Sequence, residues 1–357
     1  MDFLNFKHGS EINFVFMTDI HGRTNNPASR KDYFPDTILN KLSWVVNYAN
    51  ENDAIILCGG DWLNRPDTSP AFISKMCSEF NKAKYEIIGV LGNHDLYGYN
   101  IESFKRTPLA IAAACNNICI LPENQSLCIE LQNKKIYISG SHSSPLIDRN
   151  RRTSEYYTPR RDISKSADEE RIHIVHGFLT NKDWPDGVPY TKIDSILDTD
   201  ADILLAGHEH LGFGILEKQG TVFCNPGALG RVSAAVGEIN REVRIAHIKF
   251  QIGDSSESRL IRRMELIPLP SHIAQPADTV LDREKLEEEK NARNKIEVFA
   301  QQIQETNVEN IFRSLSDPIE AINSILENDK FGEVDITDDI RRTVLEYIGK
   351  AEELEKK

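Results

Sequence analysis

Short apolar segments alternate with amphipathic ones along the first part of the chain. Residues 12–18 and 54–58 are mostly apolar, and each ends at a polar or glycine-rich turn, which is typical of a buried strand. Between them, Ile38, Leu42 and Val45 recur at spacings of three and four, as on a helix that buries one face. The pattern predicts a strand, a helix and a second strand in one β-α-β unit.

The alternation continues to about residue 250 and predicts a layered α/β core. Further helices are expected over 70–84 and near 102–115. Further strands are expected at 86–91 and near 135–140, 172–176 and 202–206. The expected fold class is therefore α/β.

The composition and the pattern of predicted elements change after residue 250. Residues 254–258 are typical of a loop, 260–268 of one more strand, and the prolines up to Pro276 of a connector. Residues 282–306 are rich in strong helix formers, and two short amphipathic helices are expected after them. We therefore expect a main domain (1–250), a cap strand with its linker (251–280) and a helical tail (281–357). The short helices of the tail either dock on a partner or pack back on the main domain.

Composition narrows the class of protein. The chain has 357 residues and six cysteines without a C-x-x-C pair, and its apolar runs are far shorter than the roughly 20 residues that span a bilayer. The N-terminus lacks a basic stretch that leads into an apolar one. These features argue against a disulfide scaffold, a thiolate zinc site and membrane insertion, and they indicate a cytoplasmic protein in a reducing compartment.

Acidic residues exceed basic ones, and most of the excess lies near the C-terminus. The net charge is −13, and residues 281–357 hold 20 Asp and Glu against 12 Lys and Arg. This balance argues against non-specific binding of polyanions over the whole surface, but it is compatible with a local cationic groove.

Side chains that can bind metals follow five of the predicted strands. Because the carboxyl ends of parallel strands share one edge of a sheet, these side chains should converge on one crevice. Each motif alone is weak, since a Gly-Asp pair is also common in turns and a single His at a strand end is often structural. The complete set is Asp19, His21, Asp61, Asn93, His94, Asp95, His176, His208 and His210.

The residue types of this set indicate a pair of divalent ions. Two carboxylates, an amide oxygen and several imidazoles, without thiolates, suit Mn²⁺, Mg²⁺, Fe²⁺, Zn²⁺ or Co²⁺, with Mn²⁺ as the first choice. Two ions about 3.5–4 Å apart can bind the attacking and the leaving oxygen of a phosphoryl group. The expected chemistry is the hydrolysis of phosphate esters.

The ordered motifs Asp-x-His, Gly-Asp, Gly-Asn-His-Asp, His-Gly and Gly-His-x-His resemble those of the calcineurin-like metallophosphoesterases. The resemblance covers about residues 12–250 and implies a four-layer sandwich of two mixed β-sheets flanked by helices, with a C-terminal cap and helical extension. It also implies roles for the ligands. Asp19, His21 and His210 would hold one metal, Asn93, His176 and His208 would hold the other, and Asp61 would bridge them.

The same resemblance implies that His94 protonates the leaving oxygen, while Asp95 orients its ring and favours the imidazolium. His142, at the end of a predicted strand, either approaches this site or has a structural role.

Four segments are similar to the SbcD-type branch of DNA repair nucleases. They are Thr18–Gly22 (TDIHG), Gly92–Tyr97 (GNHDLY), Asp200–His210 (DADILLAGHEH) and Asn225–Arg231 (NPGALGR). This resemblance implies a DNA exonuclease or endonuclease in a bacterial or phage-infected cell. It further implies a homodimer formed by helices at about 70–84 and 101–115, and docking of the tail on an SbcC-like coiled-coil ATPase.

DNA contact requires cations on an otherwise acidic protein. Residues 149–161 hold five arginines and two adjacent tyrosines, which can clamp phosphates and stack on an unpaired base, although a solvated loop has the same composition. The candidate DNA-binding residues are Arg23, Arg149, Arg151, Arg152, Arg160 and Arg161.

Two other functions remain open at the level of the sequence. The same site could serve a phosphodiesterase or phosphatase for small molecules or cyclic nucleotides, or the chain could be a weakly active subunit that tethers DNA and assembles a complex. The zinc-peptidase motif H-E-x-x-H is excluded, because Gly212 stands where the second histidine would be. The chain also has no P-loop.

Overall fold

A computed structural model of the chain describes residues 9–149, 153–159, 165–166, 168–185, 187–233, 236–253, 260–282 and 284, together with 330–331, 334–335 and 344. The chain divides into two compact units, Met1–Leu281 and Asp282–Lys357. In the described part of the second unit, β15 (Lys330–Phe331) pairs with β16 (Val334–Asp335), a hairpin that the helical pattern of the tail did not indicate. Of the helices expected over 282–306 and in the last 40 residues, only Glu284 and Val344 are described as helical, and nearly all the rest lies outside the described residues.

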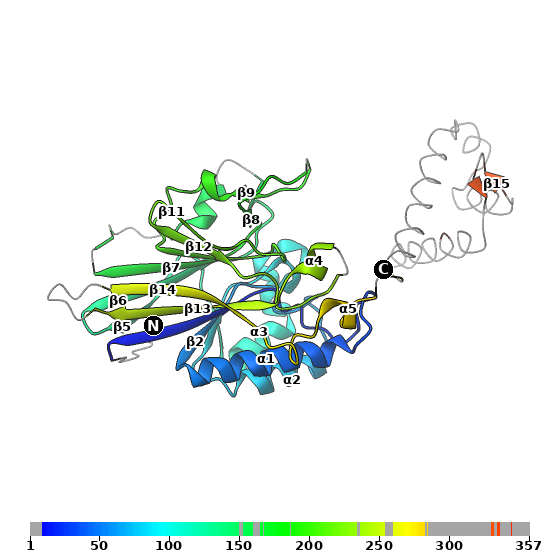
Figure 1. The fold of residues 1–357 in the computed structure, drawn as a ribbon, viewed down its shortest axis with the longest axis horizontal. Helices are drawn as coiled ribbons and strands as arrows, with labels where there is room; N and C mark the ends of the chain where they lie inside the picture. Colours follow the sequence, from blue (N-terminus) through cyan, green and yellow to red (C-terminus); the bar gives the residue numbers. More distant parts are fainter. Residues whose placement is uncertain are drawn as a thin grey trace. The chain divides into compact units, whose positions relative to one another are not determined.

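Two mixed sheets of six strands each form the first unit (Figure 1). The first sheet has the order β14 (Leu260–Pro268), β13 (Arg244–Ile252), β1 (Glu11–Met17), β2 (Ala54–Cys58), β3 (Ile87–Gly89) and β4 (Ile118–Ile120). The second has the order β11 (Gly214–Lys218), β12 (Thr221–Asn225), β10 (Ile203–Gly207), β7 (Glu169–His176), β6 (Lys134–Ser141) and β5 (Ser126–Leu131). The strands β1 to β4 are parallel, as are β6, β7, β10 and β12, so their carboxyl ends gather at common edges.

Helices cover the outer face of the first sheet, where α1 and α2 lie beneath it in Figure 1. They are α1 (Phe34–Glu51), α2 (Pro70–Phe80) and α3 (Pro108–Cys115). Each begins with a proline in its first turn, a position where the missing N–H costs no helical hydrogen bond. Ser69 and Thr107 cap α2 and α3 by accepting backbone N–H groups.

Successive side chains of β1 point alternately into the two main hydrophobic cores, one on each face of the first sheet. Phe14 and Phe16 pack between the two sheets, whereas Val15 and Met17 face the helices. This is the period of two that a strand buried on both faces requires. A third, smaller core lies on the outer face of the second sheet, where Val175 and Leu204 pack against the short 3-10 helices η4 (Thr153–Tyr157) and η5 (Ile193–Ser195). The four layers are helices, sheet, sheet and a covering of short helices and loops.

The strand at 260–268 belongs to the first sheet. Expected in a separate cap segment, β14 pairs with β13 over nine positions from Arg244↔Pro268 to Ile252↔Leu260. Met264 and Leu266 on it pack against the core between the sheets. The first unit therefore extends past residue 250, through α5 (Ala277–Val280), to Leu281.

The remaining elements are short connectors. They are η1 (Asn93–Asp95), η2 (Tyr97–Tyr99), η3 (Ile101–Arg106), α4 (Val236–Asn240) and the strand pair β8 (Leu179–Thr180) and β9 (Thr191–Lys192). The predicted helix near 102–115 is thus a 3-10 segment followed by α3, because Pro108 starts a new helix. Among the described residues, none of the helices combines the length and the apolar character that crossing a bilayer requires.

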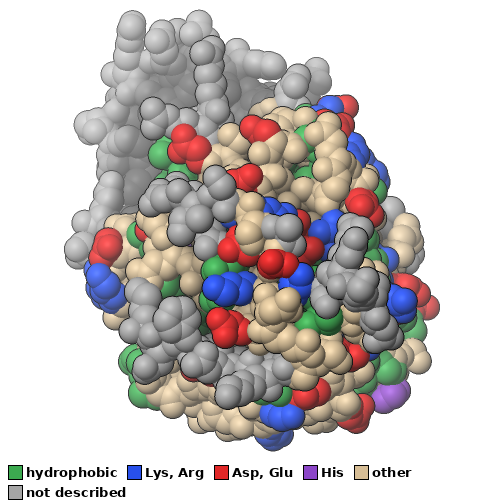
Figure 2. All heavy atoms as spheres, turned by 90° about the vertical axis from the view of Figure 1, so that its left-hand side faces the viewer, with side chains coloured by type: hydrophobic (Ala, Val, Ile, Leu, Met, Phe, Trp, Pro, Cys, Tyr) green, Lys and Arg blue, Asp and Glu red, His purple; other side chains and the backbone are tan. Residues whose placement is uncertain are grey.

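The end of the molecule at the left of Figure 1 carries both signs of charge. Figure 2 shows Lys and Arg side chains there interspersed with Asp and Glu. Ion pairs at the amino ends of the strands include Lys134–Asp168, Arg262–Glu170 and Lys249–Glu11. These three cations are therefore each balanced by a neighbouring acid.

Candidate metal centre

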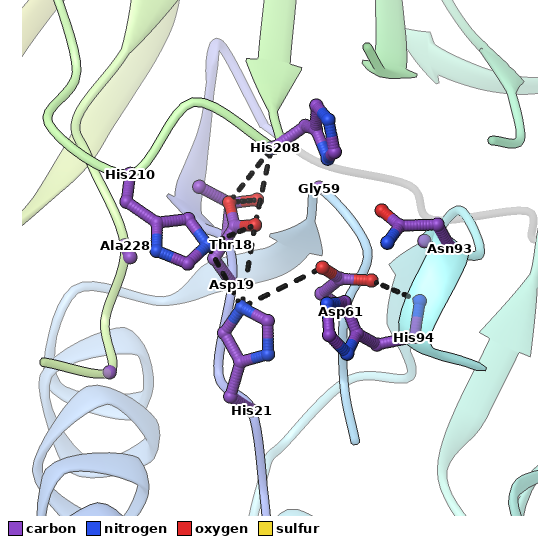
Figure 3. Close-up of polar contacts among 12 residues, drawn as sticks. Thr18, Asp19, His21, Gly59, Asp61, Asn93, His94, His208, His210 and Ala228 are labelled. Carbon is purple, nitrogen blue, oxygen red and sulfur yellow. Dashed lines mark hydrogen bonds and ion pairs between the residues drawn. The ribbon is translucent and has the colours of Figure 1, made fainter. Parts of the chain in front are cut away.

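The side chains with metal-binding groups meet at the carboxyl ends of the strands. Asp19 and His21 follow β1, Asp61 follows β2, and Asn93 with His94 lies on η1 after β3. From the second sheet, His176 ends β7, and His208 and His210 follow β10. Figure 3 shows Asp19, His21, Asp61 and His210 close together, with Asn93, His94 and His208 around them. The structure thus brings together all seven residues that the sequence singled out as ligands, with His94 beside them.

One group of ligand atoms comes from Asp19, His21 and His210. These atoms all lie within 4.8 Å of one another. Nε2 of His21 is 3.0 Å from Nε2 of His210, and Oδ1 of Asp19 is 3.9 Å and 3.6 Å from the same two atoms. Lone pairs of two imidazoles and a carboxylate therefore point at one small volume, which suits a cation.

A second group comes from Asp61, His176 and His208, again within 4.8 Å of one another. Oδ1 of Asn93 joins this group at 3.1 Å from Nε2 of His176. A third group overlaps the other two and consists of His21, Asp61 and His94. His94 is thus close enough to act as a ligand itself, although the resemblance assigned it no metal.

Asp61 occupies the position of a bridge. Its Oδ2 lies 3.6 Å from Nε2 of His21 in the first group and 3.5 Å from Nε2 of His176 in the second. Figure 3 shows it between His21 on one side and Asn93 on the other. Its Oδ1 accepts a hydrogen bond from the backbone N–H of His94 at 2.9 Å, which fixes the plane of the carboxylate.

Neighbouring polar groups orient the carboxylate of Asp19 and the imidazole of His176. The hydroxyl of Thr18 donates a hydrogen bond to Oδ2 of Asp19 at 2.7 Å, and the backbone N–H of His208 donates to the same carboxylate at 3.0 Å. Nδ1 of His176 lies 2.8 Å from the carbonyl oxygen of Gly59. A carbonyl can only accept, so Nδ1 carries the hydrogen and Nε2 is left as the ligand atom.

Four of the candidate ligands have left-handed backbones. The φ angles are 53° at Asp19, 50° at His21, 50° at Asp61 and 79° at His208. Residues other than glycine rarely adopt positive φ, and such strain is found where a site over-determines the chain. The backbone is bent here to aim these side chains inward.

Glycine is required where the strand ends crowd together. A Cβ on Gly92 would lie 2.0 Å from Oδ1 of Asp61, and a Cβ on Gly60, whose φ is +97°, would lie 2.6 Å from Nδ1 of His176. The Gly-Asp and Gly-Asn-His-Asp motifs therefore have a packing reason as well as a chemical one.

Burial sets the protonation of the imidazoles. Burial lowers the pKa of His21 to about 3 and that of His208 to about 4, so both are neutral ligands at pH 7. At His176 burial also acts to lower the pKa, but the adjacent Asp61 carboxylate outweighs it and raises the pKa to about 9. The pKa of Asp61 is held below its ordinary value by the surrounding histidines, although burial opposes this. A proton and a cation therefore compete for the space between Asp61 and His176.

The donor set fits divalent metal ions. The ligand atoms are carboxylate and amide oxygens and imidazole nitrogens on residues that are buried or partly buried, and the three groups share members. Nδ1 of His21 is buried and has no hydrogen-bond partner among the described residues. The residues present can hold two ions, with Asp61 common to both.

The expected pairing of Asp95 with His94 is wrong. The fully buried Asp95 accepts backbone N–H groups from Leu63 at 2.9 Å and Gly92 at 2.8 Å, so its carboxylate ties two loops together. Nδ1 of His94 instead lies 2.8 Å from the carbonyl oxygen of Asn64. Burial, with the Asp61 carboxylate next, raises the pKa of Asp95 to about 8, which also argues against a role as a stable anion beside an imidazolium.

The arginines expected to bind DNA are only partly described. Arg23 lies close to the centre, where its guanidinium donates to Oδ1 of Asn25 at 3.0 Å and to Oδ1 of Asn64 at 3.3 Å. Arg149 is exposed. The other four, Arg151, Arg152, Arg160 and Arg161, lie outside the described residues.

The sequence left the role of His142 open, and it did not identify two other neighbours of the centre, Asn64 and Thr18. His142 proves structural, since its Nδ1 accepts the backbone N–H of Leu91 at 3.0 Å. Asn64, which holds His94 through its backbone carbonyl, carries no signal in its side chain, because any residue could supply that carbonyl. Thr18 could have been found, because it directly precedes Asp19 in a motif that had already been singled out.

Comparisons with known proteins agree with this geometry. The family model of calcineurin-like phosphoesterases matches residues 12–212. A comparison with curated proteins finds no match.

Solved structures with similar chains are distant. The protein TT1561 of Thermus thermophilus is 10% identical, with 71% of this chain and 98% of that chain covered and a TM-score of 0.38. Vps29 of Chaetomium thermophilum is 11% identical, with 72% and 100% covered and a TM-score of 0.28.

The assignment of the chain to a family therefore depends on two findings, the family match and the metal-binding groups, and both fall on the same part of the chain. The matched residues 12–212 span more than half of the chain and contain all seven candidate ligands from Asp19 to His210. The chain belongs to the calcineurin-like phosphoesterases.

Proposed function

We propose that this protein is a two-metal DNA phosphodiesterase, the nuclease subunit of an SbcCD-like complex. The single observation that carries the hydrolytic part is the convergence of seven ligand side chains on one centre, with Oδ2 of Asp61 3.6 Å from Nε2 of His21 and 3.5 Å from Nε2 of His176. The family match supports a metal-dependent phosphoesterase. The choice of DNA is supported by the SbcD-like motifs and by the arginine-rich segment 149–161.

Each side chain has a definite task in this mechanism. Asp19, His21 and His210 would hold one ion, Asn93, His176 and His208 the other, and Asp61 both. Two bound cations supply charge neutralisation for the phosphoryl oxygens and an acidified water. Burial keeps His21 and His208 neutral, and the carbonyl of Gly59 keeps Nε2 of His176 directed at the centre.

His94 supplies the proton for the leaving oxygen. Its Nδ1 donates to the carbonyl of Asn64, which leaves Nε2 as the free ring position. Its ring stands edge to face with that of His21, with centroids 4.8 Å apart, so it lies at the rim of the centre. A protonated Nε2 at that place can act as a general acid.

Partners and assembly are also part of the proposal. The residues expected at a homodimer interface include α3, where Ile111 is 68% exposed, an unusual position for a large apolar side chain. The tail beyond residue 281 is proposed to bind the coiled-coil ATPase. Because the tail is a separate compact unit, its binding can be tested apart from hydrolysis.

The decisive experiment is cleavage of end-labelled double-stranded DNA and circular single-stranded DNA by the purified protein. Reactions contain Mn²⁺, Mg²⁺ or EDTA, with an Asp61→Ala variant as the control and bis(p-nitrophenyl) phosphate as a generic diester. Metal-dependent DNA cleavage that the substitution abolishes supports the proposal. Hydrolysis of the generic diester, with both DNA substrates left intact, would instead favour a phosphodiesterase for small molecules.

A further inference from the structure

A cavity of about 420 Å³ lies on the outer face of the second sheet. Ser139 and Ser141 of β6 and His173 of β7 form its floor. Their neighbours Ile138 and Ile174 face the core between the sheets, so the alternation of the strands turns the floor residues outward. The volume is in the range of small-ligand sites.

The cavity is built from polar groups that are held in place. His173 is 2% exposed, with Nδ1 2.9 Å from Oγ of Ser139 and Nε2 2.9 Å from the carbonyl oxygen of Tyr156. Polar groups cost free energy when they are buried on a sheet, even when hydrogen bonds offset part of that cost. The concentration of Ser139, Ser141 and His173 toward the carboxyl ends of the neighbouring strands β6 and β7 therefore indicates a binding surface.

The lining favours a neutral, flat ligand. Hydroxyl and amide groups predominate, Glu123 is an acid at the rim, and no Lys or Arg is among the described lining residues. A phosphate would therefore find no cation there. Tyr99, 46% exposed, and Tyr156 add aromatic rings on which a planar group can stack.

Three segments of the chain connect the cavity with the metal centre. Gly98, in one wall, follows His94 by four residues, so its Cα lies within roughly 15 Å of that of His94. In the other wall, Ser143 donates its backbone N–H to the carbonyl of Leu91, immediately before the Gly-Asn-His-Asp motif. Ser141 pairs in register with Val175, the residue before His176. One or two nucleotide steps would span this separation.

We propose that the cavity binds the base and sugar of an unpaired nucleotide next to the phosphate that is cleaved. This inference rests on the proposed function, because it requires a nucleic acid strand at the metal centre. The hydroxyl and amide groups bind the edges of the base and the sugar, and the tyrosines stack on the base. The enzyme thus acts on a strand whose end is open.

Two substitutions test the cavity. Ser141→Phe fills it from the floor, and Ser195→Phe adds the same ring at an exposed site outside it. Tyr99→Asn removes the exposed ring at a position with φ 58°, which asparagine tolerates, and Tyr33→Asn is its exposed control. The readouts are KM and kcat for a single-stranded oligonucleotide, those for bis(p-nitrophenyl) phosphate, and the dissociation constant of a 2-aminopurine oligonucleotide in EDTA.

The inference predicts that Ser141→Phe and Tyr99→Asn raise KM for the oligonucleotide about tenfold, the loss expected for one stacked base. Hydrolysis of the small diester should stay unchanged, as should both activities of the controls. Equal oligonucleotide KM values in all five proteins would overturn the cavity assignment and leave the nuclease proposal standing. A wild-type protein that hydrolyses the small diester but neither cleaves nor binds the oligonucleotide would overturn both.

Discussion

The ring of His94 is held by a backbone carbonyl, which changes how this residue should respond to mutation. Its Nδ1 hydrogen bond to Asn64 fixes the ring without help from an acid, while Asp95 holds the surrounding loops. Removal of the imidazole therefore leaves the loop and the seven candidate ligands in place.

We expect His94→Ala to keep its bound metal and lose activity on phosphodiesters about 10²- to 10⁴-fold, the usual contribution of a general acid. Metal content after gel filtration, measured by atomic emission, and kcat for the generic diester check this. Loss of one equivalent of metal would instead make His94 a ligand, as its place in the third group of ligand atoms allows.

Gly92→Ala tests the close approach of two loops. The added Cβ would lie 2.0 Å from Oδ1 of Asp61, so the bridging carboxylate must move. We expect metal affinity, measured by calorimetric titration of Mn²⁺, to fall about 10- to 100-fold, the range known for residues that support a ligand. Gly9→Ala is the matched control, because a Cβ there meets nothing within 4 Å. An unchanged affinity in Gly92→Ala would show that Asp61 is not a ligand.

At the residue scale, the sequence predicted which side chains meet but not how each is held. Strand ends on a common edge bring Asp19, Asp61 and His176 together through topology alone. The sequence did not predict the roles of Asp95 and Asn64, because these roles depend on the path that a loop takes over three or four residues. Adjacency in sequence suggested that Asp95 orients His94, whereas the 3-10 turn of η1 directs the two side chains to different partners.

At the scale of elements, two buried side chains, Lys41 and Arg241, support the loop that packs against the metal centre. The backbone N–H groups of Leu229 and Gly230 donate to the carbonyls of Thr18 and Asp19. The carbonyls of the same loop accept from Arg241 and from Lys41, whose Nζ lies 2.9 Å from the carbonyl oxygen of Leu229. Helix α1 thus holds Leu229 through one lysine, and Leu229 in turn donates its backbone N–H to the β1 loop.

Lys41 should make stability depend on pH. Burial, followed by the charge of Arg241, lowers its pKa well below the ordinary value. The unfolded chain therefore binds this proton more tightly, and the free energy of unfolding rises with pH between the lowered pKa and about 10.4. Urea unfolding of the metal-free protein at pH 7 and 9.5 should show wild type gaining stability relative to Lys41→Met. The exposed Lys31→Met control should track wild type, and parallel changes in all three proteins would contradict the assignment.

Predicted elements match the structure best where the hydrophobic period is strong. The segments at 54–58 and 260–268 coincide with β2 and β14. The outer strands β5 and β11 were not predicted, because they are partly exposed and their alternation is weak. The strands β12 and β13 were also not predicted, although most of their residues are buried. Assignment of β14 to a cap failed for another reason: pairing with β13 joins segments across a loop, and no local pattern reports such a pairing.

At the scale of the whole molecule, the boundary between the units predicts which truncations are tolerated. A chain that ends at Asp282 keeps α5, whose Val280 carbonyl accepts the backbone N–H of Lys31. We expect it to retain the melting temperature of the first unit and full hydrolysis of the generic diester. Differential scanning fluorimetry and steady-state kinetics measure both quantities.

A chain that ends at Gly253 should fail. It lacks β14, which pairs with β13 over nine positions and partly buries Met264 and Leu266 against the core between the sheets. Full burial of such a side chain is worth about 1.5–3 kcal/mol, and even part of this for each side chain is a large share of the stability of a typical domain. Soluble expression and a cooperative melting transition in this shorter chain would show that β14 is dispensable.

The positive φ angles of four candidate metal ligands link the lifetime of the protein in the cell to the supply of metal ions. Four residues with positive φ hold strain of about 1 kcal/mol each, which the unfolded chain does not carry. An ion that binds only the folded chain offsets this strain, by about 2.7 kcal/mol at a concentration 100 times its Kd. Metal starvation would then enlarge the unfolded fraction that proteases remove. Cells short of metal would lose this protein by turnover as well as by inactivation.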